Sequence, residues 1–147
     1  AENVFIGHNQ SKNKLGIDWK DTDRRALEIL KRLNITVDPR REVSSLPQHE
    51  QQLVEIARAL SFDTRVLLLD EPTAGINPTL INGLIDRLHK ANQELGITLC
   101  VIEHNMRVIM NLAEHIYCLS NGKMLADGKP EELQSDQRVI DAYLGGH

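Results

Sequence analysis

Seven consecutive residues, Val66-Leu67-Leu68-Leu69-Asp70-Glu71-Pro72, constrain the fold of this chain more than any other stretch. Four apolar residues are followed at once by two carboxylates and a proline. The apolar part has the length of a short strand that is buried on both faces inside a parallel sheet. Because open α/β sheets bind ligands at the carboxyl ends of their strands, Asp70 and Glu71 are predicted to face a ligand crevice.

The pairing of Asp70 with Glu71 has two interpretations. Neighbouring carboxylates repel each other unless a cation lies between them or their pKa values separate. A hydrated Mg²⁺ on a nucleotide would meet this need, with one acid holding the metal and the other orienting a water. Alternatively, both carboxylates are solvated turn residues after a core strand. The pattern by itself favours neither interpretation.

A second apolar run, Ile97–Ile102, also ends in polar side chains, among them His104. The residues between the two runs, 78–95, have the periodicity of an amphipathic helix. Two buried strands joined by a helix form a right-handed crossover, which predicts that Asp70, Glu71 and His104 lie on one edge of a sheet. There His104 is a candidate sensor of a terminal phosphate; the alternative is an ordinary turn or helix-start residue.

The other elements follow from local signals. Asn121-Gly122 is a strong two-residue hairpin signal. Cys100 and Cys118 both lie in apolar, strand-like surroundings, so buried free thiols are expected. The periodicity and turn signals predict helices over 21–34, 51–60, 78–95 and 106–112, strands over 97–102, 115–119 and 123–127, and short surface helices over 131–133 and 136–144.

Length and composition are those of one ordinary globular domain. The chain has 147 residues, of which 41% are hydrophobic and 26% charged. Its formal net charge of −4 offers no basic patch for nucleic acid or an anionic membrane. No apolar run reaches the ~18–20 residues needed to cross a bilayer, and no signal peptide opens the chain, so a cytosolic protein is expected. The first residue is Ala1 and an apolar run follows directly, which suggests a sequence cut from something longer.

Several stretches in order resemble the ATP-binding subunits of ABC transporters. Val4–Gly7 is similar to simple-sugar importers, whereas the sequence from Glu71 to the closing Ala142–Gly145 looks more like branched-chain amino-acid importers. The family motifs are matched by Leu53–Leu60 (the helix after the signature), Leu67–Thr73 (Walker B and the catalytic glutamate), Ala74–Asn77 (the D-loop) and Val101–His104 (the switch histidine).

The resemblance implies an α/β fold, a partial P-loop NTPase with a mostly parallel sheet, flanking helices and part of the helical subdomain. Residues 1–60 would belong to the helical, signature-bearing subdomain and 61–147 to the C-terminal half of the catalytic core. ATP and Mg²⁺ are the implied ligands. Asp70 would hold the metal through its water shell, Glu71 would polarise the attacking water, and His104 would contact the γ-phosphate.

The resemblance also implies partners. Two such subunits close head to tail on ATP, as a homodimer or a heterodimer, and act on transmembrane permease subunits. The protein would therefore be cytoplasmic, held at the inner face of the membrane only through those subunits. Nucleotide contacts are implied for the D-loop residue Asn77 and for the signature position, which consists here of Leu46, Pro47, Gln48, His49 and Glu50.

Two departures from the family pattern limit these expectations. No G-x-x-x-x-G-K-S/T phosphate loop occurs in the 147 residues. The signature position, usually Leu-Ser-Gly-Gly-Gln, reads Leu46-Pro47-Gln48-His49-Glu50. A helix start can bind phosphate, although most bind only water, and here Pro47 supplies no N–H while Glu50 adds negative charge. Anion binding at this position should be weakened.

The leading hypothesis is the ATP-binding component of an importer of a small nutrient, a branched-chain amino acid or a simple sugar, unable to hydrolyse ATP unaided. The alternative is a noncatalytic interaction or regulatory module that keeps the fold and has lost nucleotide binding. Pro47 and the missing phosphate loop favour that alternative. An ABC-type ATPase of DNA repair or translation is disfavoured, because the chain is acidic and shows no basic stripe.

Overall fold

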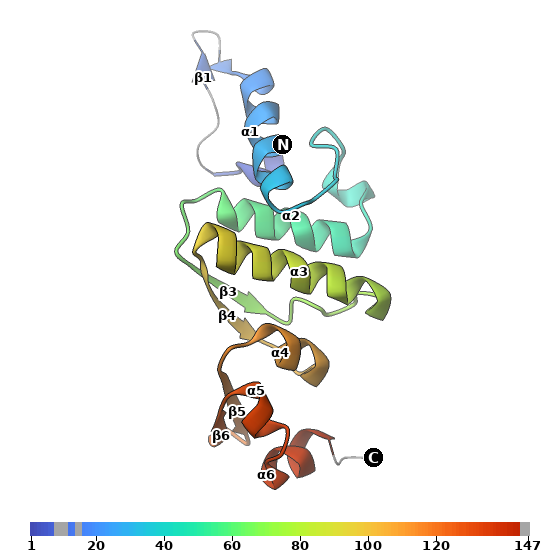
Figure 1. Cartoon of the computed structure of the whole chain (residues 1–147). Coiled ribbons are helices and arrows are strands. Elements are labelled where there is room, and N and C mark those ends of the chain that lie inside the picture. The colour runs from blue at the N-terminus through green and yellow to red at the C-terminus, as the bar shows by residue number, and fades with distance from the viewer. Residues whose placement is uncertain (8–11, 14–15, 145–147) are drawn as a thin grey trace. The chain divides into compact units, whose positions relative to one another are not determined.

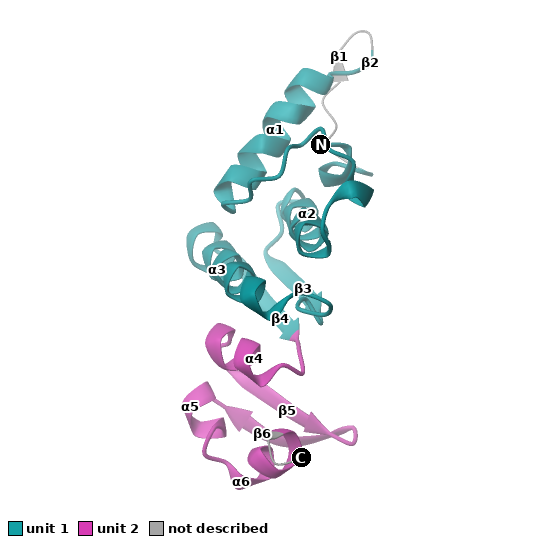
Figure 2. Ribbon diagram, turned by 90° about the vertical axis from the view of Figure 1, so that its right-hand side faces the viewer, with its two compact units in different colours: residues 1–101 teal, residues 102–147 magenta. Residues whose placement is uncertain are grey.

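The computed structural model describes residues 1–7, 12–13 and 16–144. These residues form two compact units, 1–101 and 102–147 (Figure 2). Helices and short strands occur in both units. The described strands pair in three two-stranded sheets, β1 with β2, β3 with β4, and β5 with β6.

The first unit opens with a helical segment. A short 3-10 helix, Glu2–Val4, precedes the antiparallel strands β1 (Lys12–Asn13) and β2 (Gly16–Ile17), and α1 spans Trp19–Arg32. The carboxylate of Asp18 caps α1 by accepting a hydrogen bond from the backbone N–H of Asp21 at 3.1 Å. The helix therefore begins two residues before the predicted start at residue 21.

Helix α2 (Gln48–Leu60) follows the 3-10 helix Val43–Ser45 and begins after Pro47. Its residue Val54 belongs to a core that also holds the N-terminal segment and α1. The guanidinium of Arg25 lies 4.8 Å over the ring of Phe5, at the edge of this core. The buried residues of the cluster are Val4, Phe5, Ala26, Leu46 and Val54.

Strands β3 (Val66–Asp70) and β4 (Thr98–Ile102) are joined by the long helix α3 (Pro78–Leu95) and lie side by side, running in the same direction (Figure 1). The N–H of Thr98 donates to the carbonyl of Arg65 at 2.8 Å. Helix α3 ends at Leu95, and its C-cap residue, Gly96, is left-handed with φ of +67°. The strand–helix–strand order and the bounds of α3 are as predicted.

Strand β3 is buried on one face only, which corrects the prediction of a strand buried on both. Leu67 and Leu69 are buried, but Val66 and Leu68 are 61% and 63% exposed. Cys100 in β4 is also exposed, so its predicted burial is wrong. The side chains alternate across the pleat, and no element in the described part of the first unit covers the second face.

The second unit begins after Val101 and is built on a hairpin. Helix α4 (Met106–Leu112) has the predicted bounds and is followed by β5 (Ile116–Ser120) and β6 (Lys123–Gly128). Asn121 and Gly122 both have positive φ, 49° and 73°, so the predicted two-residue turn is confirmed. Short helical turns complete the unit: α5 (Pro130–Leu133), α6 (Gln137–Val139) and a π-helical turn, Ile140–Leu144.

Cys118 lies on the buried face of β5, as predicted. Burial raises the pKa of its thiol, because the thiolate loses hydration. The Tyr143 hydroxyl donates to the carbonyl of Leu119 and ties the closing turn to the hairpin. None of the helices in the described part of the chain combines the length and apolar character needed to cross a bilayer.

Candidate functional site

The carboxyl end of β3 presents two acids to solvent. Asp70 is the last residue of the strand and Glu71 the first beyond it, and both are exposed. Glu71 has φ of +45°, a left-handed conformation that is uncommon for a residue with a side chain. The carbonyl of Glu71 accepts from the N–H of Ala74 at 3.0 Å, which closes a tight turn. Pro72 and Thr73 are buried beneath it, so the turn is anchored while the carboxylates stay accessible.

The other end of this loop is fixed by Asn77, the N-cap of α3. Its Oδ1 accepts from the N–H of Thr79 at 3.0 Å and from the Thr79 hydroxyl at 2.9 Å. The amide oxygen thus satisfies a backbone donor of the first turn, and Pro78 fits there because it has no N–H to satisfy. The loop from Glu71 to Asn77, which we call the acid loop, is therefore held at both ends.

The stretch at the signature position meets the acid loop through one side chain. The Nε2 of Gln48 donates to the carbonyl of Ala74 at 3.3 Å. A Cβ at Gly75, where φ is +69°, would lie 2.4 Å from the same Nε2 atom, so a larger residue there would displace Gln48. The structure therefore brings Gln48 and the acid loop together within the first unit.

The remaining residues of this stretch lie in different surroundings. Leu46 is 4% exposed and belongs to the core, whereas Pro47 is exposed. His49 and Glu50 line a cavity between α2 and α3. Pro47 and Gln48 are thus the exposed part of the five-residue stretch.

His104 belongs to the second unit, where a buried acid holds its backbone. The side chain of Glu103 is fully buried, and its Oε2 accepts from the N–H groups of His104 and Asn105, each at 3.0 Å. The imidazole of His104 is 74% exposed, with Nδ1 4.0 Å from the same oxygen. Glu103 thus caps α4 in place of the Asn105 side chain, which makes no capping bond. The sequence interpretation missed this role, although an acid just before a helix start was a signal for it.

The acids of the first unit suit a hydrated divalent cation. Mg²⁺ prefers oxygen ligands, keeps several waters, and is bound in nucleotide sites by one or two carboxylates together with phosphate oxygens. Exposed neighbouring carboxylates at Asp70 and Glu71 match that donor set. In the described ranges, no three His, Cys, Asp or Glu side chains gather as a cage made by the protein alone.

Comparison with protein families gives two matches. Residues 2–74 match the ABC transporter family, and residues 123–147 match a C-terminal region described as branched-chain amino acid ATP-binding cassette transporter. The first match includes Asp70 and Glu71, and the second begins within β6.

Individual proteins agree with the family matches. The chain is 36% identical over 131 residues to the high-affinity branched-chain amino acid transport ATP-binding protein BraF of Pseudomonas aeruginosa, covering 86% of this chain and 51% of BraF. It is 33% identical to the L-arabinose transport ATP-binding protein AraG of Geobacillus stearothermophilus, over 99% of this chain and 28% of AraG. The chain therefore spans about half the length of BraF and less of AraG.

A solved structure has the same fold. The ADP conformation of MJ1267, an ATP-binding cassette of an ABC transporter, superposes with a TM-score of 0.75 at 28% identity, covering 91% of this chain and 54% of that one. The predicted α/β fold of a partial P-loop NTPase and the predicted family are thereby confirmed. Both kinds of importer named by the resemblance occur among the relatives.

Proposed function

Because the chain belongs to the ATP-binding cassette family of ABC transporters, we propose that it serves as the ATP-binding component of an importer of branched-chain amino acids. The observation that carries the proposal is the pair of exposed carboxylates, Asp70 and Glu71, at the carboxyl end of β3. The match of residues 123–147 supports the choice of transported solute. Import of a simple sugar is the second candidate, supported by the similarity to AraG along nearly the whole chain.

Each acid has a role in this proposal. Asp70 would hold Mg²⁺, which would supply positive charge to offset the phosphates of ATP. Glu71 would orient and polarise the attacking water, and the anchored turn at φ of +45° sets the direction of its Cα–Cβ bond. Catalysis here consists mainly of positioning and charge stabilisation.

The remaining predicted site residues enter as supporting parts of the proposal. His104 contacts the γ-phosphate, and its exposure in the second unit leaves the imidazole accessible to a ligand. Asn77 and the stretch Leu46–Glu50 border the nucleotide, with exposed Pro47 and Gln48 as the contact residues. The division into a helical part, 1–60, and a catalytic part, 61–147, belongs to the same proposal.

The proposed partners are a second ATP-binding subunit and the transmembrane permease subunits. ATP would lie between two such subunits, and the protein would meet the membrane only through the permease at its cytoplasmic face. The alternative of a noncatalytic interaction or regulatory module is supported by a sequence observation: the 147 residues contain no G-x-x-x-x-G-K-S/T loop, and Pro47 replaces a donor at the signature position.

The test joins this chain to the N-terminal part of a relative that carries a phosphate loop, and measures Mg²⁺-dependent ATP hydrolysis. We expect turnover by the joined protein and a loss of about 10²–10³-fold in Glu71→Gln, because the amide cannot accept the proton of the water. Asp86→Asn, an exposed acid of α3, is the matched control and should leave turnover unchanged.

Two outcomes would decide against the proposal, and a third would contradict one of its expectations. Equal turnover in Glu71→Gln and Asp86→Asn would remove Glu71 from the reaction. A joined protein that folds and neither binds nor hydrolyses ATP would favour the noncatalytic module. Rapid Mg²⁺-dependent hydrolysis by the unjoined chain would contradict the expectation that it cannot turn over ATP unaided.

A further inference from the structure

The sequence contains the dipeptide Asn-Gly twice, at Asn82-Gly83 and at Asn121-Gly122. The two copies lie in different secondary structure. Asn82-Gly83 is inside helix α3, whereas Asn121-Gly122 forms the two-residue turn between β5 and β6. Both asparagine side chains are exposed, so the conformation of the backbone, and not access to water, distinguishes the two copies.

An asparagine that precedes a glycine can lose its side-chain amide without an enzyme. The backbone nitrogen of the glycine attacks the side-chain carbonyl carbon, the new C–N bond closes a succinimide ring, and the amide group leaves with the N–H proton as ammonia. Water then opens the ring at either carbonyl and gives aspartate or isoaspartate. Glycine favours the attack, because it has no Cβ to shield its nitrogen. Water is the co-reactant, and no oxidant or reductant is consumed.

The copy in the hairpin turn lies in open surroundings. A Cβ built on Gly122 would meet no atom within 4 Å apart from its chain neighbours. The amide of Asn121 donates to Oγ of the adjacent Ser120 at 3.4 Å, a long bond to a residue at the end of β5. For the attack, nitrogen and carbon must approach to about 3–3.5 Å, so the turn must leave its left-handed conformation. Only the tip of the hairpin has to open for this.

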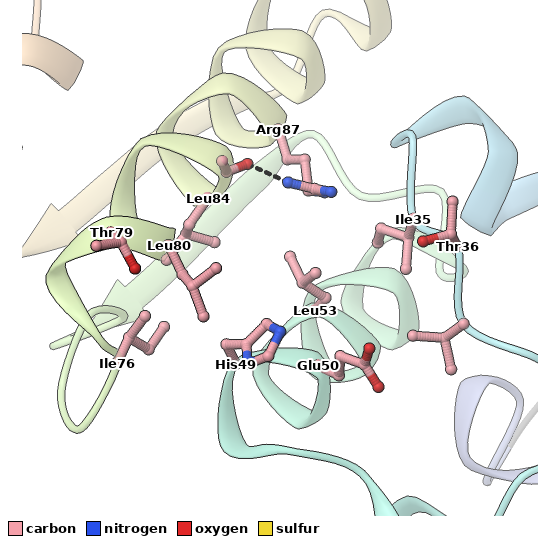
Figure 3. Close-up of a pocket in the computed structure, with 12 residues that line it drawn as sticks. Ile35, Thr36, His49, Glu50, Leu53, Ile76, Thr79, Leu80, Leu84 and Arg87 are labelled. Carbon is pink, nitrogen blue, oxygen red and sulfur yellow. Dashed lines mark hydrogen bonds between the residues drawn. The ribbon is translucent and has the colours of Figure 1, made fainter.

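The copy in α3 is held by the helix and by packing. In an α-helix each backbone N–H donates to the carbonyl four residues earlier, which engages the nitrogen of Gly83. The carbonyl of Gly83 accepts from Nη1 of Arg87 (Figure 3, dashed line). The flanking side chains of Ile81 and Leu84 are buried. Attack on Asn82 would therefore require a turn of the helix to open together with its buried side chains.

We propose that Asn121 is a site of spontaneous modification, at which isoaspartate forms within the hairpin turn. The inference goes beyond the proposed role in transport and does not depend on it. In isoaspartate the backbone passes through the side chain and gains one methylene group. The lengthened turn cannot keep the register in which Ser120 pairs with Lys123. The new carboxylate also adds one negative charge to a chain whose formal net charge is −4.

The experiment is incubation of the full folded chain in mildly alkaline buffer without nucleotide. Tandem mass spectrometry of its peptides measures the gain of one dalton at each asparagine. Methylation by an isoaspartyl-specific carboxyl methyltransferase with S-adenosylmethionine distinguishes isoaspartate from aspartate. We expect Asn121 to be modified at least tenfold faster than Asn82. In denaturing guanidinium chloride the two rates should become similar, because the helix that protects Asn82 is lost.

Two variants test the site and its consequence. Asn121→Gly removes the amide and keeps the turn, because Gly-Gly also adopts it, and it should lose most of the isoaspartate. Asn82→Ala, the matched control in α3, should leave the isoaspartate yield unchanged. We expect incubation to lower the unfolding temperature of the original chain but not that of Asn121→Gly. Asn121→Asp before incubation has the added charge without the added methylene, and should keep an unfolding temperature close to the original.

Three results would overturn the inference: equal rates at Asn82 and Asn121 in the folded chain, a tenfold difference that persists in the denatured chain, or an isoaspartate yield that Asn121→Gly leaves unchanged. The second result would mean that neighbouring sequence, and not the fold, selects Asn121. Because nucleotide is left out, a failure of the ATP proposal does not affect this test.

Discussion

Two strand ends carry the proposed chemistry, and the chain builds them differently. After β3, Glu71 is placed by its own backbone, at φ of +45°, and by an anchored loop that ends at the Asn77 cap. After β4, His104 is placed by a neighbouring side chain, the buried carboxylate of Glu103 that binds two backbone N–H groups. The end of β3 depends on a left-handed backbone conformation that few non-glycine residues adopt, and the end of β4 depends on a single buried acid.

This difference predicts which substitutions destabilise each strand end. At the first, the shape of the residue at position 71 matters, because a left-handed backbone penalises bulk at Cβ. At the second, the carboxylate at position 103 matters, because it accepts from the backbone N–H groups of both His104 and Asn105. Substitutions at Glu71 and at Glu103 therefore test whether backbone conformation fixes the first strand end and a capping carboxylate fixes the second.

The largest effect is expected for Glu71→Val. A β-branched residue is a genuine outlier at φ of +45°, so the free energy of unfolding should fall by about 1–3 kcal/mol. Glu71→Gly should change it by less than about 1 kcal/mol, because relief of the left-handed backbone offsets the greater entropy of glycine in the unfolded chain. Urea denaturation measures the free energy of unfolding of both variants. Equal losses for Val and Gly would mean that a side-chain contact, rather than the backbone, places Glu71.

A somewhat smaller effect is expected for Glu103→Ala. Removing the carboxylate leaves the N–H groups of His104 and Asn105 without their acceptor, which should cost about 1–2 kcal/mol. Amide exchange of these two residues should accelerate. Glu103→Gln keeps an acceptor oxygen and should lose less.

The control for this substitution is Glu114→Ala, an exposed acid of the second unit, which should be neutral. If Glu103→Ala were as neutral as Glu114→Ala, α4 would hold its start without a cap. The contrast between the two strand ends would then disappear.

Elements whose signals are local could be predicted from the sequence. Helix α3 begins at Pro78 and ends before Gly96, and the hairpin turns at Asn121-Gly122, as those residues indicate. Burial of β3 could not be predicted in the same way. A run of apolar residues shows that a strand can be covered on both faces, but whether it is covered depends on other elements, and here Val66 and Leu68 are exposed.

The same distinction applies to the candidate sites. Asp70 and Glu71 follow an apolar run, so their position at a strand end was visible in the sequence. The cavity that both Glu50 and Arg87 line was not visible there, because it depends on how α2 and α3 pack. The capping role of Glu103 lies between these cases, since its signal is local but weak.

The smallest effect is expected for Asn77→Ala, which removes the cap of α3 but not the left-handed turn at Glu71. Loss of the Oδ1 acceptor should lower the free energy of unfolding by about 1 kcal/mol, and Gln93→Ala, an exposed polar residue on the same helix, should change it by a few tenths at most. If the turn alone places Glu71, the double substitution of Asn77→Ala with Glu71→Gly should cost the sum of the two single changes. A non-additive result would show that turn and cap act as one unit, and the backbone of Glu71 would then depend on a neighbouring side chain, as that of His104 does.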